Sequence, residues 1–142
     1  MASKVRVVLN HDKFMKQLAD SIEVKLHRIG MLIVSTAVRK VNIGQKVRRA
    51  KSGRLVGLQP SKPGKPPRTL SGRFKQSITH VVERQVGTMR LKVGSNVSYA
   101  RRLELGFVGR DKRGRNVSQA ARPWLRVSVQ QVWKKIGEIM RS

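Results

Sequence analysis

The sequence predicts an α+β domain in which a long N-terminal helix and a C-terminal helix pack on a small antiparallel sheet. Three observations predict this fold class. Apolar residues recur at three- and four-residue steps over residues 12–41, and a second helical period runs over residues 123–140. Apolar and polar residues alternate over residues 79–83 and 89–93, with a break between them, which is typical of a β-hairpin.

Length and composition indicate one domain with an inserted arm. The 142 residues are 39% hydrophobic, which is enough for one modest core. Between residues 42 and 71 the periodicity disappears and Gly, Pro, Ser, Lys and Arg predominate. We therefore predict a single domain over residues 1–142 with a long, basic, mostly irregular arm at about residues 42–71. Regular structure in this arm is opposed by Pro60, Pro63, Pro66 and Pro67.

The N-terminal helix is predicted to begin at the pair His11 and Asp12, after a short alternating segment at residues 5–9 that indicates an edge strand beside the hairpin. Asp20 and Glu23 are expected to balance nearby Lys and Arg on its exposed face. A glycine within the helix, Gly30, predicts a bend or a close helix contact. The predicted buried stripe consists of Phe14, Leu18, Ile22, Leu26, Ile29, Ile33 and Ala37.

Shorter elements are predicted between the arm and the C-terminal helix. Residues 72–78 are expected to form a helical turn, and residues 98–105 a short helix. Residues 106–120 are rich in Gly and basic side chains, which indicates a second irregular excursion. Pro123 suits the first turn of the last helix.

Charge is the strongest global feature of the sequence. Lys and Arg number 32 against 7 Asp and Glu, giving a formal net charge of +25 and a sequence pI of about 12.0. Such self-repulsion requires an anionic partner, either nucleic acid or the acidic face of another protein. The arm contains no acidic and no aromatic residue, so base stacking on single strands is not expected. We predict an interaction role for Lys46, Arg48, Arg49, Lys51, Arg54, Lys62, Lys65, Arg68, Arg110, Lys112, Arg113 and Arg115.

Signals for catalysis and metal binding are weak. The chain has no Cys, which excludes disulfides, thiolate metal sites and a cysteine nucleophile. The three histidines are scattered along the sequence, and the seven acidic residues are too dispersed to predict an acid/base pair or a metal cluster. Residues 57–65 lack the glycine spacing of a phosphate-binding loop, and Pro66 occupies the position of its Ser or Thr. We therefore predict that the chain is not an enzyme and has no cofactor or metal.

No membrane partner is expected. The longest apolar run, residues 31–34, is far shorter than a membrane span, and the first ten residues lack the apolar region of a signal peptide. We expect synthesis and assembly in a bacterial cytoplasm.

Three phrases of the sequence occur in a fixed order. Residues 61–78 are similar to the pattern PGxPPxxxTGxLxxSI, residues 93–106 to VGxxxxYAxxxExG, and residues 121–126 to xRPFLxPA. In this order and spacing they resemble the head-to-tail joining or tail-completion (neck) protein family of tailed bacteriophages. Ser71 replaces the usual Thr of the first phrase and Phe74 its usual Leu. In the third phrase Trp124 replaces Phe, and Val and Ser replace the following Pro and Ala.

These phrases specify a scaffold rather than chemistry. Their prolines fix an extended arm, Gly72 permits a turn, and Tyr99 and Trp124 can anchor the junction between sheet and helix. We expect Tyr99 and Trp124 to pack in the core and Glu104 to act as a cap or in an ion pair. The residues that carry the resemblance are Pro63, Gly64, Pro66, Pro67, Gly72, Ser77, Tyr99, Ala100, Glu104, Gly106, Arg122, Pro123 and Trp124.

The resemblance implies a small structural virion protein that forms a homo-oligomeric ring at the phage neck, between the connector and the tail tube. Its implied partners are copies of itself, the connector or head-closure protein, the tail-tube protein and the passing double-stranded DNA genome. The large excess of basic residues departs from the family pattern. It indicates either a DNA-facing lumen or an acidic neighbouring protein, and the sequence leaves both open. The tail terminator, head-closure and tail-completion layers of the neck also remain open.

Charge alone indicates a different class, a free nucleic-acid-binding protein such as a ribosome- or nucleoid-associated factor. Binding by such a protein would weaken steeply with salt and persist in the monomer. A third class, a nuclease, is disfavoured because acidic residues and histidines are so few.

Overall fold

The computed structural model describes residues 11–42, 47–49, 51, 55–58, 61–69 and 72–142. Within these residues the chain forms the helices α1 (His11–Asn42), α2 (Arg73–Gln76), α3 (Ala100–Leu105) and α4 (Leu125–Arg141). The strands are β1 (Val47–Arg49), β2 (Leu55–Leu58), β3 (Ile78–Gln85), β4 (Thr88–Ser95), β5 (Phe107–Arg110) and β6 (Asn116–Gln119). They pair as three separate two-stranded antiparallel sheets, β1 with β2, β3 with β4 and β5 with β6.

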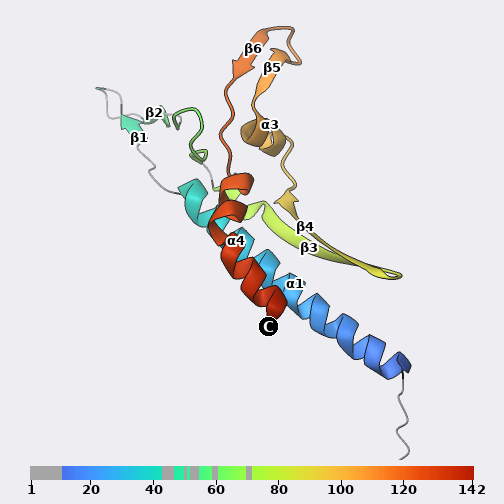
Figure 1. The fold of residues 1–142 in the computed structure, drawn as a ribbon. Coiled ribbons are helices and arrows are strands. Elements are labelled where there is room, and N and C mark those ends of the chain that lie inside the picture. Colours follow the sequence, from blue (N-terminus) through green and yellow to red (C-terminus); the bar gives the residue numbers. More distant parts are fainter. Residues whose placement is uncertain (1–10, 43–46, 50, 52–54, 59–60, 70–71) are drawn as a thin grey trace, which may run out of the picture.

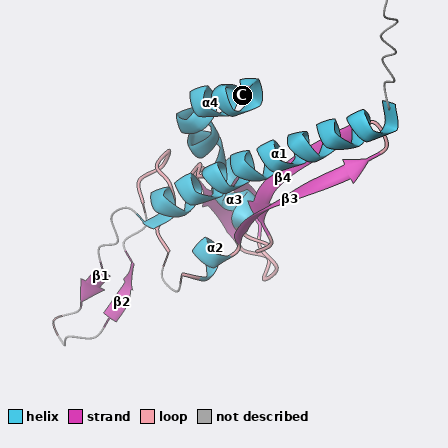
Figure 2. Cartoon of the chain, turned by 90° about the horizontal axis from the view of Figure 1, so that it is seen from below, coloured by secondary structure: helices cyan, strands magenta, loops and turns pink. Residues whose placement is uncertain are grey.

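Helix α1 is the central element of the fold. It lies between α4 and the β3–β4 hairpin, as Figures 1 and 2 show, and it contacts α4 and both strands of the hairpin. The predicted α+β class with a long N-terminal helix, a C-terminal helix and an antiparallel hairpin is therefore confirmed. The hairpin runs in continuous register from the pair Ile78 and Ser95 to the pair Gln85 and Thr88, closed by a two-residue turn. The C-terminal helix reaches this hairpin mainly through α1.

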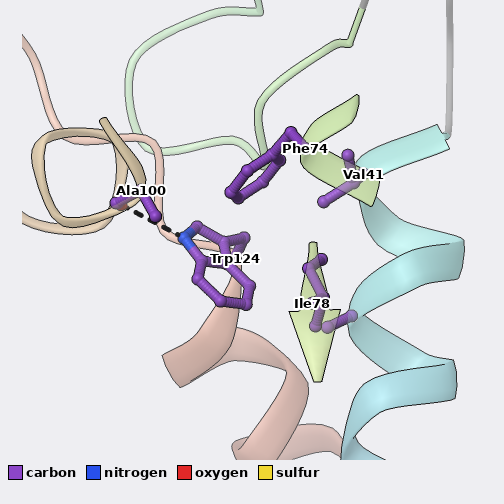
Figure 3. Close-up of a cluster of buried hydrophobic side chains, with 6 residues drawn as sticks. Val41, Phe74, Ile78, Ala100 and Trp124 are labelled. Atoms are coloured by element: carbon purple, nitrogen blue, oxygen red, sulfur yellow. Dashed lines mark hydrogen bonds between the residues drawn. The ribbon is translucent and has the colours of Figure 1, made fainter. Parts of the chain in front are cut away.

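The buried side chains form two clusters along α1. One surrounds Trp124 and consists of Ala37, Val41, Phe74, Ile78, Ala100 and Trp124 (Figure 3). The other joins α1 to α4 through Ile29, Ile33 and Val132. Both clusters lie on the C-terminal half of α1, so that half holds the domain together.

The predicted apolar stripe of α1 is buried only in part. Ile29, Ile33 and Ala37 are buried as expected, but Phe14 is 60% exposed and Leu18 is 44% exposed. The N-terminal turns of α1 extend beyond α4 (Figure 1), so no other described element covers them fully. There Arg84 of β3 reaches α1 and pairs with Asp20 at 3.2 Å and Glu23 at 3.5 Å, which agrees with the expected charge-balancing role of both acids.

Two segments predicted as irregular contain hairpins instead. The arm holds β1 and β2, with a register shift between Arg48 and Arg49, and the excursion over residues 106–120 holds β5 and β6. Strands of three or four residues give too few repeats for a period of two to be detected among Gly and basic residues. The last helix also begins later than predicted, because Trp124 is its N-cap and Pro123 precedes it. The predicted strand at residues 5–9 lies outside the described residues.

Gly30 marks a close contact, but with the sheet rather than with a helix. A Cβ atom added there would lie 2.3 Å from Cδ2 and 3.0 Å from Cβ of His80 in β3. His80 also approaches His27 of α1, with 3.3 Å between Nε2 and Nδ1. The two histidines that looked scattered in the sequence are therefore neighbours in the fold. The close approach explains why α1 tolerates a helix-weakening glycine at this position.

This contact makes Gly30→Ala an informative substitution. In an open helix position the change would stabilise by up to about 1 kcal/mol. Here the added methyl must displace the His80 ring, so we expect a net loss of about 1 to 2 kcal/mol. Urea unfolding of both variants measures this, with Gly137→Ala in α4 as the matched control because its added Cβ would meet only Arg141 at 3.6 Å. Equal stabilisation by the two substitutions would contradict the close packing of α1 on β3.

Candidate functional site

The three sequence phrases meet in space around Trp124. This side chain is 2% exposed, and its indole packs edge-on against Phe74 of α2 with ring centroids 5.1 Å apart. Its Nε1 donates a hydrogen bond to the carbonyl oxygen of Ala100 in α3 at 3.4 Å (Figure 3). We call this unit, made of residues 61–69, α2, α3 and residues 121–124, the Trp124 junction. Its buried tryptophan confirms the expected core role of that residue.

Glu104 fixes α3 to the start of α4. Its carboxylate accepts hydrogen bonds from the backbone N–H groups of Trp124, Leu125 and Arg126 at 2.7, 2.9 and 3.0 Å. The first N–H groups of a helix have no partner within the helix and carry its positive dipole end, so a carboxylate there is doubly favourable. Of the two roles expected for Glu104, the structure therefore shows capping, and the cap belongs to a different helix from the one that carries the residue.

Arg122 joins the arm to the same junction. Its Nε donates to the carbonyl oxygen of Ser61 at 3.1 Å, and its backbone N–H donates to that of Leu103 at 2.6 Å. The N–H of Gly64 in turn donates to the carbonyl oxygen of Ala121 at 2.9 Å. Residues 61–69 are therefore held against the body of the domain, with Ser61, Pro67 and Thr69 buried. This part of the predicted irregular arm is therefore packed against the domain, and we call residues 61–69 the strap.

The remaining motif residues take positions in or beside the junction. Gly64 and Gly72 adopt positive φ angles of 77° and 72°, and Pro123 is buried. Gly106 has a φ of 77°, and an added Cβ there would lie 2.8 Å from the carbonyl oxygen of Gln119. Ser77 links α2 to β4 through a 2.6 Å hydrogen bond between its Oγ and that of Ser95.

Tyr99 differs from its expected core role. Its side chain is 42% exposed and lies against the core residue Phe74, with ring centroids 5.9 Å apart. The residue lies at the N-cap of α3, where the chain turns at the surface of the domain. The core position next to Ala100 is taken by the larger indole of Trp124 instead.

The predicted basic residues that the structure describes lie on separate parts of the fold. Lys46 and Arg54 lie outside the described residues, and Arg48 and Arg49 belong to β1. The strap carries Lys62 and Lys65, both exposed, and Arg68, which is half-buried; Lys51 is exposed as well. A separate group lies on the β5–β6 hairpin, which Figure 1 shows well away from β1 and β2. This group consists of Arg110, Lys112, Arg113 and Arg115, all exposed.

The turn between β5 and β6 is organised by Asp111. Its Oδ1 accepts the backbone N–H groups of Arg113 and Arg115 at 2.8 and 2.9 Å, and its Oδ2 accepts Nε of Arg115 at 2.8 Å. Hydrogen bonds from the backbone and side chain of Arg115 hold the pKa of Asp111 below its usual value. Apart from its glycine, no feature of the sequence predicts this turn, because the acceptor and the donors are common residue types.

Beyond these contacts, the described residues bring one pair of histidines together, His27 and His80. Within the described ranges no group of three or more His, Asp or Glu side chains is arranged to hold a metal ion. Among the same residues no helix is long and apolar enough to cross a membrane. Comparison of the chain with protein families, with curated proteins and with solved structures gave no match.

The cap formed by Glu104 predicts a stability effect. Replacing Glu104 by Ala leaves three helix-start N–H groups in the partly buried junction without their acceptor, so we expect a loss of roughly 2 kcal/mol. Glu138→Ala is the matched control, because Glu138 is exposed in the last turns of α4 and its loss should change stability by less than about 0.5 kcal/mol. Urea unfolding followed by circular dichroism measures both. Equal effects would argue against the cap.

The contacts of Asp111 predict a pH response confined to the β5–β6 turn. Because its pKa is lowered in the folded chain, the carboxylate contributes stability that is present above the unfolded pKa and is lost as pH falls through the folded pKa. We expect the NMR titration midpoint of the Asp111 carboxyl to lie below 3.8, the ordinary value. The amide signals of Arg113 and Arg115 should shift with the same midpoint. In Asp111→Asn these amide signals should be displaced at neutral pH and should lose the acid transition.

Proposed function

We propose that the chain is a structural virion protein of a tailed bacteriophage that forms a ring at the head-to-tail junction. The observation that carries the proposal is the Trp124 junction. Three phrases chosen for their resemblance to neck proteins lie far apart in the sequence, yet their residues contact one another around a single buried side chain. A shared structural motif would bring its parts together in this way.

The chemistry of the junction supports a scaffold role. Glu104, Arg122 and the indole of Trp124 all direct their polar atoms to backbone groups of neighbouring segments. Such groups fix the relative positions of α3, α4 and the strap, and a polar atom used in this way is not available to a substrate. The proposal is therefore one of assembly, with no catalytic step.

Exposed apolar side chains supply surfaces for neighbours. A subunit of a ring needs two different faces toward its neighbours and further faces toward the layers above and below. Leu105 and Val108, at 67% and 82% exposure, lie near the α3–β5 end, and Trp133 at 66% lies on α4. A third surface is the open groove between the N-terminal turns of α1 and the tip of the β3–β4 hairpin, where Val86 is fully exposed. Separate surfaces of this kind suit a subunit with several neighbours.

The net charge favours a second candidate, a free nucleic-acid-binding protein. The +25 charge is common to both candidates, so DNA binding by the purified chain does not separate them. They differ in where the protein is found. A ring subunit is a stoichiometric component of finished particles, whereas a free factor is absent from them.

Loss of the chain tests the proposal in a phage that encodes it. We expect a nonsense mutant to accumulate DNA-filled heads and separate tails that fail to join, and a plasmid copy of the gene to restore joined particles. Cryo-electron microscopy of the restored particles should show this chain as a closed ring between connector and tail tube. Complete infectious particles that lack the chain would overturn the proposal.

A further inference from the structure

The tip of the β5–β6 hairpin is a preformed turn, although it lies at the surface. Besides the three hydrogen bonds that Asp111 accepts, its backbone N–H donates to the carbonyl oxygen of Arg115 at 2.9 Å. Gly114 closes the turn with a φ of 76°, and its N–H donates to the carbonyl oxygen of Asp111 at 2.9 Å. The backbone of the tip is thus fixed before any partner arrives, which lowers the entropic cost of binding.

The tip presents cations that no acid neutralises. Its single acidic residue, Asp111, is engaged by Arg115 in an ion pair of 2.7 Å. In the described part of the chain, no ion pair joins Arg110, Lys112 or Arg113 to a carboxylate, and all three side chains are exposed. Three positive charges therefore project from one rigid turn.

The composition of the tip favours a phosphate backbone over a protein surface. Residues 110–116 contain no apolar and no aromatic side chain, whereas the fully buried centre of a protein interface is mostly apolar and poor in charged residues. The lack of an aromatic residue also disfavours unpaired bases, which bind by stacking. A two-stranded β-ribbon fits the width of the major groove of B-form DNA, while the corresponding groove of duplex RNA is too deep and narrow for side chains.

We propose that the β5–β6 tip is a finger that binds the phosphate backbone of double-stranded DNA without reading its sequence. Arg110, Lys112 and Arg113 supply the contacts, and Asp111 is a positioning residue that shapes the turn. The inference deepens the proposed function and rests on it for the presence of duplex DNA next to the protein. In the proposed ring, the finger assigns the β5–β6 end of the subunit to the DNA channel.

The salt dependence of DNA binding tests the finger in the purified full-length chain. Each phosphate contact contributes about 0.9 to the slope of log K against log salt concentration. Replacing Arg110, Lys112 and Arg113 together by Gln should therefore reduce the slope for a short DNA duplex by about 2 to 3. The matched control is Lys134→Gln, Lys135→Gln and Arg141→Gln, which removes the same charge from exposed positions toward the opposite end of the chain (Figure 1). We expect this control to reduce the slope by less than about 1.

The outcomes separate the finger from its rivals. Equal slope changes in the two triple variants would overturn the proposal, because binding would then depend on overall charge alone. A poly-glutamate probe that binds as tightly as the duplex, and loses affinity equally in the finger variant, would also overturn it in favour of an acidic protein partner. Circular dichroism and thermal melting should be unchanged in both variants, because all six side chains are exposed.

Failure of the finger and failure of the ring give different results. A finger variant introduced into the nonsense-mutant phage should still be incorporated into particles if the ring proposal holds, whatever its effect on DNA binding. If the finger variant and the control variant show the same salt slope but the chain is still incorporated into particles, only the finger proposal fails. If the two variants differ in salt slope but the chain is absent from particles, the ring proposal fails and the DNA-binding finger stands.

Discussion

The position of α3 relative to the start of α4 depends on the carboxylate of Glu104. Among the residues that the structure describes, the three sheets share no strand with one another, so no continuous hydrogen-bonded ladder runs through this part of the chain. What orders it is a small number of contacts between short elements and helices. Glu104 holds α3 against the first N–H groups of α4, and this places Trp124 between α2, α3 and α1. From there α4 continues along α1 to form the second cluster at Val132.

The sequence predicted the elements whose period repeats many times. The sequence predicts a helix over residues 12–41, and α1 spans His11–Asn42. The agreement is close because apolar residues repeat with the helical period over several turns. The β3–β4 hairpin has eight residues in each strand and was also predicted. The two short hairpins were missed because strands of three or four residues show too few repeats of the alternating pattern. The turn of β5–β6 depends on Asp111 and Gly114, whose hydrogen bonds appear only once the backbone is folded.

The candidate site was predicted as a set of residues but not as a set of contacts. The resemblance singled out Arg122 and Glu104, yet their partners are backbone groups of Ser61, Trp124 and Leu125. Almost any residue type supplies such groups, proline being the exception for the N–H. No pattern of side chains in a sequence identifies such a partner. The same reasoning explains Tyr99, whose aromatic character suggested a core position although the turn before α3 leaves it partly exposed. The strap over residues 61–69 was predicted as extended chain, but its attachment to the domain includes the hydrogen bond from Arg122 to the carbonyl oxygen of Ser61, which the sequence could not indicate.

The distribution of acidic residues limits how the charge of the chain can be offset. Glu104 is used in the cap and Asp111 in the turn, while Asp20, Glu23 and Glu83 pair with Arg84 and Lys92 within the same molecule. Little negative charge is left for a second copy, although the chain carries 32 basic residues. Copies placed side by side in the proposed ring would repel one another over distances of about 8 Å at physiological salt. An anion that binds the assembled ring better than the separate subunits would stabilise the ring by linkage. Duplex DNA, with one charge per about 1.7 Å of its axis, has the charge density to do so. In the proposed ring, closure of the ring and binding of the genome would therefore favour each other.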